Sequence, residues 1–172
     1  LLLCILCAAL LANAQDTIPL GKALQLGIVD VTIEGHSGYG SKFKSLQKGN
    51  AHYGECIALS AKLKSDSALV LHIPIGSLLV PGDSAYQNMI ITKDAHVELS
   101  EDKGVTRDIR LFAMCGEIED MSPHRGIFYD YHGEVDSLTL SVVRRISADR
   151  QQNRFGQALL WTVTDPDKVE RI

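Results

Sequence analysis

Apolar and polar side chains alternate along much of the first two thirds of the chain. Residues 29–34, 56–64 and 105–115 follow this two-residue period, which is typical of a strand with one buried face. Residues 69–73 are apolar on both faces, which predicts a central strand. Shorter apolar runs separated by Pro-Gly turns predict further strands. The pattern therefore indicates a domain built mainly from short strands.

One of these strands makes a specific prediction about a cysteine. Its apolar face carries Ile57, Leu59 and Ala61, and Ser60 lies on the opposite, polar face. By the same alternation we expect Cys56 to share the polar face with Ser60.

The hydrophobic period changes in the last third of the chain. Apolar residues recur every four positions from Leu138 to Ile146, which predicts an amphipathic helix over about 135–149 with these residues on its buried face. A second helix is predicted over about 155–163, ended by Pro166. Strands followed by helices indicate an α+β fold, with an N-terminal antiparallel β-sandwich or barrel and two C-terminal helices.

Two segments lack a clear period. Residues 15–25 look like a short polar lead-in, and residues 35–50 contain four glycines with several Ser and Lys. We interpret the second segment as a long glycine-rich loop that can present a site to a partner.

The start of the chain has the features of a secretory signal peptide. Residues 1–11 are continuously apolar, but this run is too short to cross a bilayer as a helix. The small residues at 12–14 (Ala-Asn-Ala) predict cleavage before Gln15. We expect residues 1–14 to be a signal peptide and residues 15–172 to form a single globular domain without a membrane span, which is secreted, periplasmic or at the cell surface.

Composition and charge narrow the possible partners. The chain is 45% hydrophobic and 22% charged, as in ordinary globular proteins, and its net charge is −4 without a basic stripe. This argues against nucleic acid, which requires clustered Lys and Arg. The six histidines show no HxH or helical i, i+4 spacing, and no CxxC occurs in residues 15–172, so the sequence predicts neither a metal site nor a cofactor.

The cysteines offer one structural prediction. Cys4 and Cys7 would leave with the signal peptide, so the mature chain would keep Cys56 and Cys115. Two cysteines in an oxidising compartment usually form one disulfide. Both lie in predicted strands, so a Cys56–Cys115 disulfide is one interpretation.

A second interpretation comes from the order of residues in the last third. Cys115 closes an apolar strand, a Pro/Gly loop with tyrosines follows, and Gln157 stands four residues before Trp161 in the second predicted helix. Over about residues 110–165 this order resembles the thioester domains of bacterial surface adhesins. The resemblance implies an intramolecular thioester between Cys115 and Gln157, with Trp161 as the helix Trp. The family usually has Thr where this chain has Gly156.

The chemistry that the resemblance implies needs no cofactor. The Cys115 thiolate attacks the Gln157 side-chain carbonyl and expels ammonia, and proximity must lower most of the barrier because an amide is a poor electrophile. An amine on a surface protein or glycan could then capture the acyl group. A cysteine cannot form a thioester and a disulfide together, so the two interpretations exclude each other.

Two classes of function remain open. The first is a non-enzymatic binding or adhesion domain, in its sharpest form with the thioester. The second is an extracytoplasmic hydrolase that draws its residues from Asp83, His124, Asp130 and His132. Their spacing does not position a nucleophile against a base, so we favour the first class.

Overall fold

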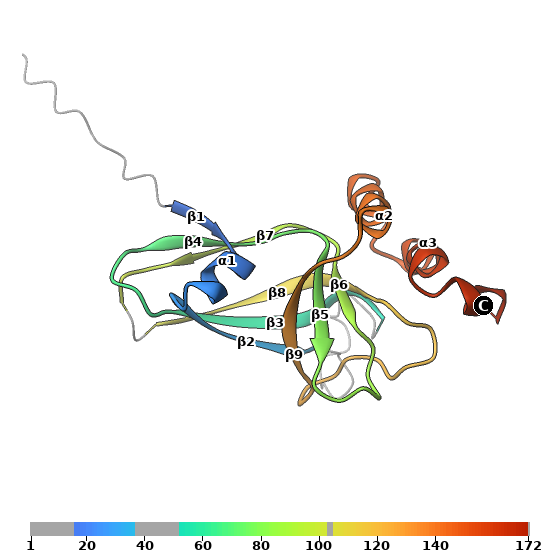
Figure 1. Cartoon of the computed structure of the whole chain (residues 1–172), viewed down its shortest axis with the longest axis horizontal. Coiled ribbons are helices and arrows are strands. Elements are labelled where there is room, and N and C mark those ends of the chain that lie inside the picture. The colour runs from blue at the N-terminus through green and yellow to red at the C-terminus, as the bar shows by residue number, and fades with distance from the viewer. Residues whose placement is uncertain (1–15, 37–51, 103–104, 172) are drawn as a thin grey trace, which may run out of the picture.

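A computed structural model describes residues 16–36, 52–102 and 105–171 of the chain. Within these ranges the fold is α+β, with a closed antiparallel barrel, a small three-stranded sheet and two C-terminal helices (Figure 1). The predicted fold class is confirmed, and the strands form the barrel rather than the sandwich. The predicted signal peptide and most of the predicted glycine-rich loop lie outside the described residues.

The barrel places strands from distant parts of the chain side by side. In order around the barrel its strands are β2 (Val29–Gly35), β3 (Tyr53–Leu63), β8 (Thr106–Cys115), β6 (Met89–Ile91), β5 (Ser77–Pro81) and β9 (Phe128–Glu134). Every neighbouring pair is antiparallel, and β9 closes the ring by pairing with β2. Closure pairs the strands on both sides, so the barrel presents no open edge.

A small sheet packs beside the barrel. Its strands are β1 (Asp16–Pro19), β4 (Leu69–Ile73) and β7 (Ala95–Leu99), in that spatial order, and β1 leads into the short helix α1 (Leu20–Gln25). Strand β4 is central, as predicted, but only one of its faces is buried. Leu71 and Ile73 face the barrel core, whereas His72 on the other face hydrogen-bonds Asp94 at 3.0 Å.

The two helices lie together near one end of the barrel (Figure 1). Helix α2 (Ser137–Ala148) and helix α3 (Arg154–Thr164) match the predicted helices closely, and a 3-10 helix, η2 (Pro166–Arg171), follows them.

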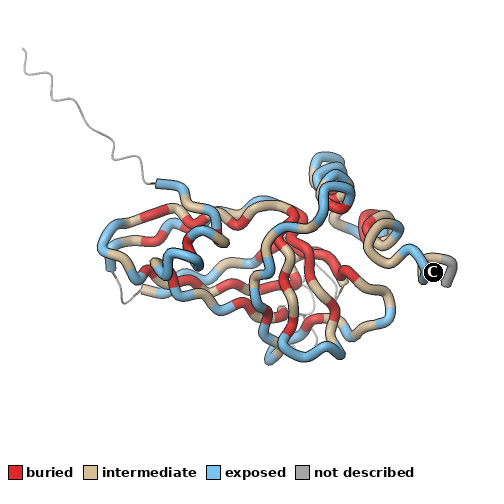
Figure 2. The backbone as a smooth tube through the Cα atoms, in the orientation of Figure 1, coloured by how far each residue is buried: buried red, intermediate tan, exposed pale blue. Residues whose placement is uncertain are grey.

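The predicted buried face of α2 is wrong in part. Ile146 is buried, but Leu138 is 60% exposed, and Val143, which lies outside the four-residue recurrence, is fully buried. Val143 and Ile146 of α2, together with Leu160 of α3, pack on Ile90 and Met114 of the barrel and form a second, smaller core. Figure 2 shows buried segments on both helices and on the barrel. The sequence period located the helix but not its rotation, because that depends on the surface against which the helix packs.

Because of a β-bulge, the observed position of Cys56 differs from the predicted one. The pairing of β3 with β8 shifts register between Gly54 and Ile57, which inserts an extra residue into β3. Both Cys56 and Ile57 are therefore buried, at 1% and 0% exposure, although they are neighbours in sequence. The prediction that Cys56 shares the polar face with Ser60 is wrong for this reason.

Candidate functional site

The structure brings together two of the residues that the sequence singles out, Cys115 and Gln157. The Cys115 backbone N–H donates to Gln157 Oε1 at 3.1 Å, and Gln157 Nε2 donates to the Cys115 carbonyl oxygen at 2.8 Å. Cys115 is fully buried and Gln157 is 2% exposed, although 42 positions separate them in sequence. The carboxamide therefore pairs with the backbone N–H and C=O of Cys115, as a residue of a neighbouring strand would.

Helix α3 presents Gln157 because of the residues at its start. The Asn153 side chain caps the helix by accepting from the backbone N–H groups of Phe155 and Gly156, at 2.9 and 3.2 Å. Gly156 is buried, and a Cβ at this position would overlap the carbonyl oxygen of Gln151. The missing side chain thus lets the first turn of α3 pack closely against the preceding loop.

The Cys115 sulfur lies at the end of β8, next to a histidine. Sγ is 3.7 Å from His52 Nδ1 and 3.7 Å from Met89 Sδ. His52 also accepts from the Cys115 N–H through its backbone carbonyl, at 2.9 Å. Ser122 Oγ lies 3.1 Å from His52 Nδ1, so a thiol, an imidazole and a hydroxyl meet at one point.

Burial determines the protonation of this cluster. Desolvation raises the pKa of the Cys115 thiol well above its ordinary value, and electrostatic interactions with Cys56 and Glu117 raise it further. Desolvation also lowers the pKa of His52. The site therefore holds a protonated thiol beside a neutral imidazole, which is able to accept a proton.

Trp161 lies one helical turn after Gln157 and reaches the same cluster. Its ring meets the His52 ring edge-on, with 6.2 Å between the centroids and 74° between the planes. Trp161 packs against the barrel core, and its buried Nε1 has no hydrogen-bond partner among the described residues. All three residues of the predicted thioester motif thus surround the end of β8.

The disulfide candidate stays a prediction. In the structure Cys56 is a thiol whose Sγ donates to the Ala113 carbonyl oxygen at 3.5 Å, and burial raises its pKa to about 12. Cys56 and Cys115 face the same barrel core from neighbouring strands, β3 and β8. An intact-mass measurement separates a disulfide from a thioester.

The hydrolase candidates do not assemble into a site. Asp83 accepts from the Ala85 backbone N–H in a turn, and His124 Nε2 lies 3.0 Å from the Tyr86 hydroxyl. Asp130 and His132 are exposed on β9. Within the described ranges no hydrogen bond or ion pair joins any two of the four hydrolase candidates.

Sequence reasoning missed His52 and Ser122. They lie 63 and 7 positions from Cys115, and no short motif links them to it. No cluster of three or more His, Cys, Asp or Glu that could hold a metal occurs among the described residues. In the same part of the chain, no helix is long and apolar enough to cross a bilayer.

Comparison with known proteins does not assign the chain to a family. A scan against protein-family models and searches of curated proteins and of solved structures each found no match.

Proposed function

We propose that this protein is an extracytoplasmic binding domain in which Cys115 and Gln157 form an intramolecular thioester that captures an amine on a partner. The observation that supports the proposal is the pair of hydrogen bonds that the Gln157 carboxamide forms with the backbone N–H and C=O of Cys115. These bonds hold the electrophilic carbon of Gln157 beside the residue that bears the nucleophile. Such positioning is what an unreactive amide needs.

The proposed reaction exchanges a C–N bond for a C–S bond. Cys115 Sγ attacks Gln157 Cδ, and negative charge develops on Oε1, where the Cys115 N–H already donates a hydrogen bond. The Cδ–Nε2 bond then breaks, and Nε2 leaves as ammonia. His52, with Nδ1 3.7 Å from Sγ, takes the thiol proton and transfers it to the leaving nitrogen.

Burial favours the thioester over the thiolate. A thiolate is costly in this dry site, as the raised pKa of Cys115 reflects, whereas a thioester carries no charge. The same exclusion of water slows hydrolysis of the thioester. In the capture step a primary amine attacks Cδ, the C–S bond breaks, and the thiol is restored as a stable amide forms.

Intact-mass spectrometry of the purified protein tests the proposal. We expect a mass lower than that of the unmodified chain by about 17 Da, the mass of one ammonia. Cys115→Ala and Gln157→Ala should each abolish the deficit. Methylamine should convert the wild type into a stable adduct at Gln157, which peptide mapping would locate.

Two matched variants serve as controls. Gln87 is also fully buried and donates through Nε2 to a backbone carbonyl, that of Asp120, so Gln87→Ala should keep the deficit. Cys56→Ser should keep it as well. A deficit of about 2 Da that a reductant reverses would instead indicate the Cys56–Cys115 disulfide and contradict the thioester. An unshifted mass would contradict both.

A further inference from the structure

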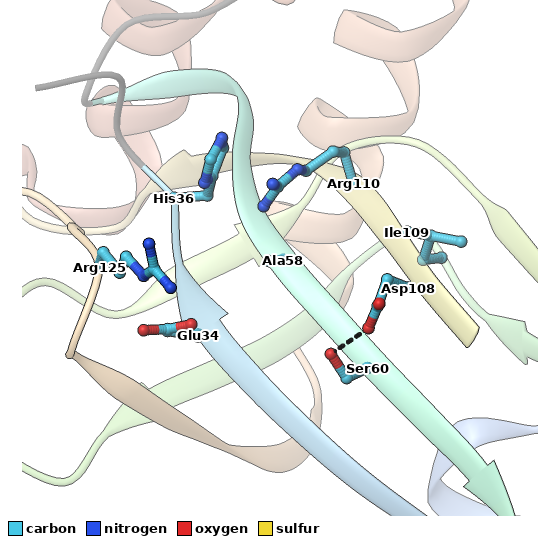
Figure 3. Close-up of a pocket in the computed structure, with 8 residues that line it drawn as sticks. All are labelled: Glu34, His36, Ala58, Ser60, Asp108, Ile109, Arg110 and Arg125. Carbon is cyan, nitrogen blue, oxygen red and sulfur yellow. Dashed lines mark hydrogen bonds between the residues drawn. The ribbon is translucent and has the colours of Figure 1, made fainter. Parts of the chain in front are cut away.

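The outer wall of the barrel carries a polar groove of about 510 Å³ over β2, β3 and β8 (Figure 3). Its floor is made by two small side chains of the middle strand, Ala58 and Ser60. Strand pairing aligns Ala58 with Glu34 on one side and with Arg110 on the other. Side chains aligned in this way point to the same face of the sheet, so the longer ones form walls above the small ones.

Two guanidinium groups enter this groove from different segments. Arg110 is exposed on β8, and Arg125 is exposed on the loop before β9. Figure 3 shows them on opposite sides of His36, each reaching inward. The loop that carries Arg125 is fastened to the wall, because the Gly126 backbone N–H donates to Glu34 Oε1 at 2.7 Å.

The two arginines have no carboxylate partner in the part of the chain that the structure describes. The neighbouring carboxylates already have other partners: Glu34 accepts from Gly126, and Asp108 accepts from Ser60 Oγ at 2.5 Å. Arginine presents a planar fork of donors that matches a carboxylate. Two such forks at one end of a groove are suited to an anionic group of a ligand.

We propose that this groove binds a carboxylated sugar, such as a uronic acid residue of an acidic glycan, with the sugar carboxylate held by Arg110 and Arg125. Ser60 and the carboxylates of Glu34 and Asp108 supply the acceptors that sugar hydroxyls require. The volume of about 510 Å³ lies within the range of small-molecule sites. This site goes beyond the proposed thioester, because neither Cys115 nor Gln157 takes part in it.

The strand pairing argues for a sugar rather than an extended peptide. Peptides commonly add as a strand to an open sheet edge. Each of β2, β3 and β8 is paired on both sides within the barrel, so the groove offers a sheet face and not an edge. Recognition at this face must come from side chains, and those that line the groove are mainly charged and polar.

A ligand titration, monitored through the backbone amide chemical shifts in NMR spectra, tests this site. The probes are D-galacturonate and D-glucuronate, with D-galactose and D-glucose as uncharged counterparts and acetate as the anion alone. We expect saturable shifts in β2, β3 and β8 with at least one uronate. The neutral sugars and acetate should each bind at least about tenfold more weakly, because the neutral sugars lack the carboxylate and acetate lacks the sugar hydroxyls.

Variants locate the binding. Arg110→Gln and Arg125→Gln should each weaken uronate binding about tenfold, the effect of losing one charge-assisted hydrogen bond. Ala58→Leu, which fills the floor and keeps both arginines, should abolish binding. Arg144→Gln alters an exposed arginine on α2 and should leave the affinity unchanged. Cys115→Ala should bind like the wild type, which separates this site from the thioester.

Three results would overturn the proposal. Equal affinity for acetate and uronate would show a simple anion site. Binding that persists in the Arg110→Gln, Arg125→Gln double variant would place the ligand elsewhere. The absence of saturable shifts with either uronate would show that the groove does not recognise these sugars.

Discussion

The carboxamide of Gln157 and the peptide group of Cys115 form a reciprocal pair of hydrogen bonds, 3.1 and 2.8 Å long, across the junction between α3 and β8. The bonds use the backbone of Cys115 and leave its sulfur available for chemistry. The pairing therefore has a structural effect that does not depend on the thioester, and the two effects can be measured separately.

The first prediction separates these effects by a double-mutant cycle. In a Cys115→Ala background, Gln157→Ala should lower the free energy of unfolding by about 2 kcal/mol, because the buried Cys115 carbonyl oxygen loses its donor. In the wild type Nε2 has left as ammonia, so Gln157→Ala removes the thioester cross-link and not this hydrogen bond. By the loop-entropy relation for disulfides, loss of the cross-link costs about 4 kcal/mol. Urea unfolding of the four proteins measures both terms, and equal losses in the two backgrounds would contradict the cross-link.

The second prediction concerns Gly156, a position at which the adhesin thioester domains that the sequence resembles usually have Thr. Gly156→Thr should destabilise the protein by about 2 kcal/mol or more, because its Cβ would overlap the Gln151 carbonyl oxygen and push α3 away from the preceding loop. Thermal and urea unfolding measure the loss. Gly82→Ala is the control, since a Cβ at position 82 meets no atom within 4 Å. A neutral Gly156→Thr variant would show that the loop yields easily.

The third prediction concerns the cap of α3. Asn153→Ala should cost about 1 kcal/mol of stability, because the N–H groups of Phe155 and Gly156 lose their side-chain acceptor. Asn153→Asp keeps an acceptor oxygen and should stay near the wild type. If the start of α3 positions Gln157, the alanine variant should also form its thioester more slowly after refolding, as followed by mass. An unchanged rate would show that the core packing of α3 alone is sufficient.

The fourth prediction is the pH dependence of uronate binding. Burial lowers the pKa of His36 below its usual 6.5, Arg110 and Arg125 lower it further, and Glu34 opposes them. His36 is therefore neutral at pH 7 and gains a positive charge only as the pH falls below 6.5. A sugar carboxylate, with a pKa of about 3.5, stays ionised in this range. Affinity should rise as the pH falls from 7 to about 5.

His36→Gln is the control for the pH experiment. Because glutamine does not titrate, this variant should bind uronate with a nearly constant affinity over the same range. A rise in affinity that persists in His36→Gln would assign the pH dependence to another group of the groove.

The part of the fold that could be predicted is the part that depends on the spacing of apolar and polar residues within one segment. Alternation in segments such as 29–34 depends only on which side chains can face water, so it identified strands without their partners. The four-residue recurrence identified α2 in the same way. In the sequence, residues 15–25 look like a polar lead-in, but β1 and α1 form there because Leu20 and Ala23 are buried against the core, which a short polar segment does not reveal.

The candidate site, too, could be predicted only in part. The sequence by itself determined which reactive groups are present: a cysteine at the end of a strand, and a glutamine one helical turn before a tryptophan. Only the tertiary structure decided that Gln157 pairs with Cys115, that His52 lies at its sulfur, and that a bulge turns Cys56 into the core. The physical reason is that side-chain patterns report burial one element at a time, whereas these contacts depend on barrel closure and on how the helices dock against the barrel.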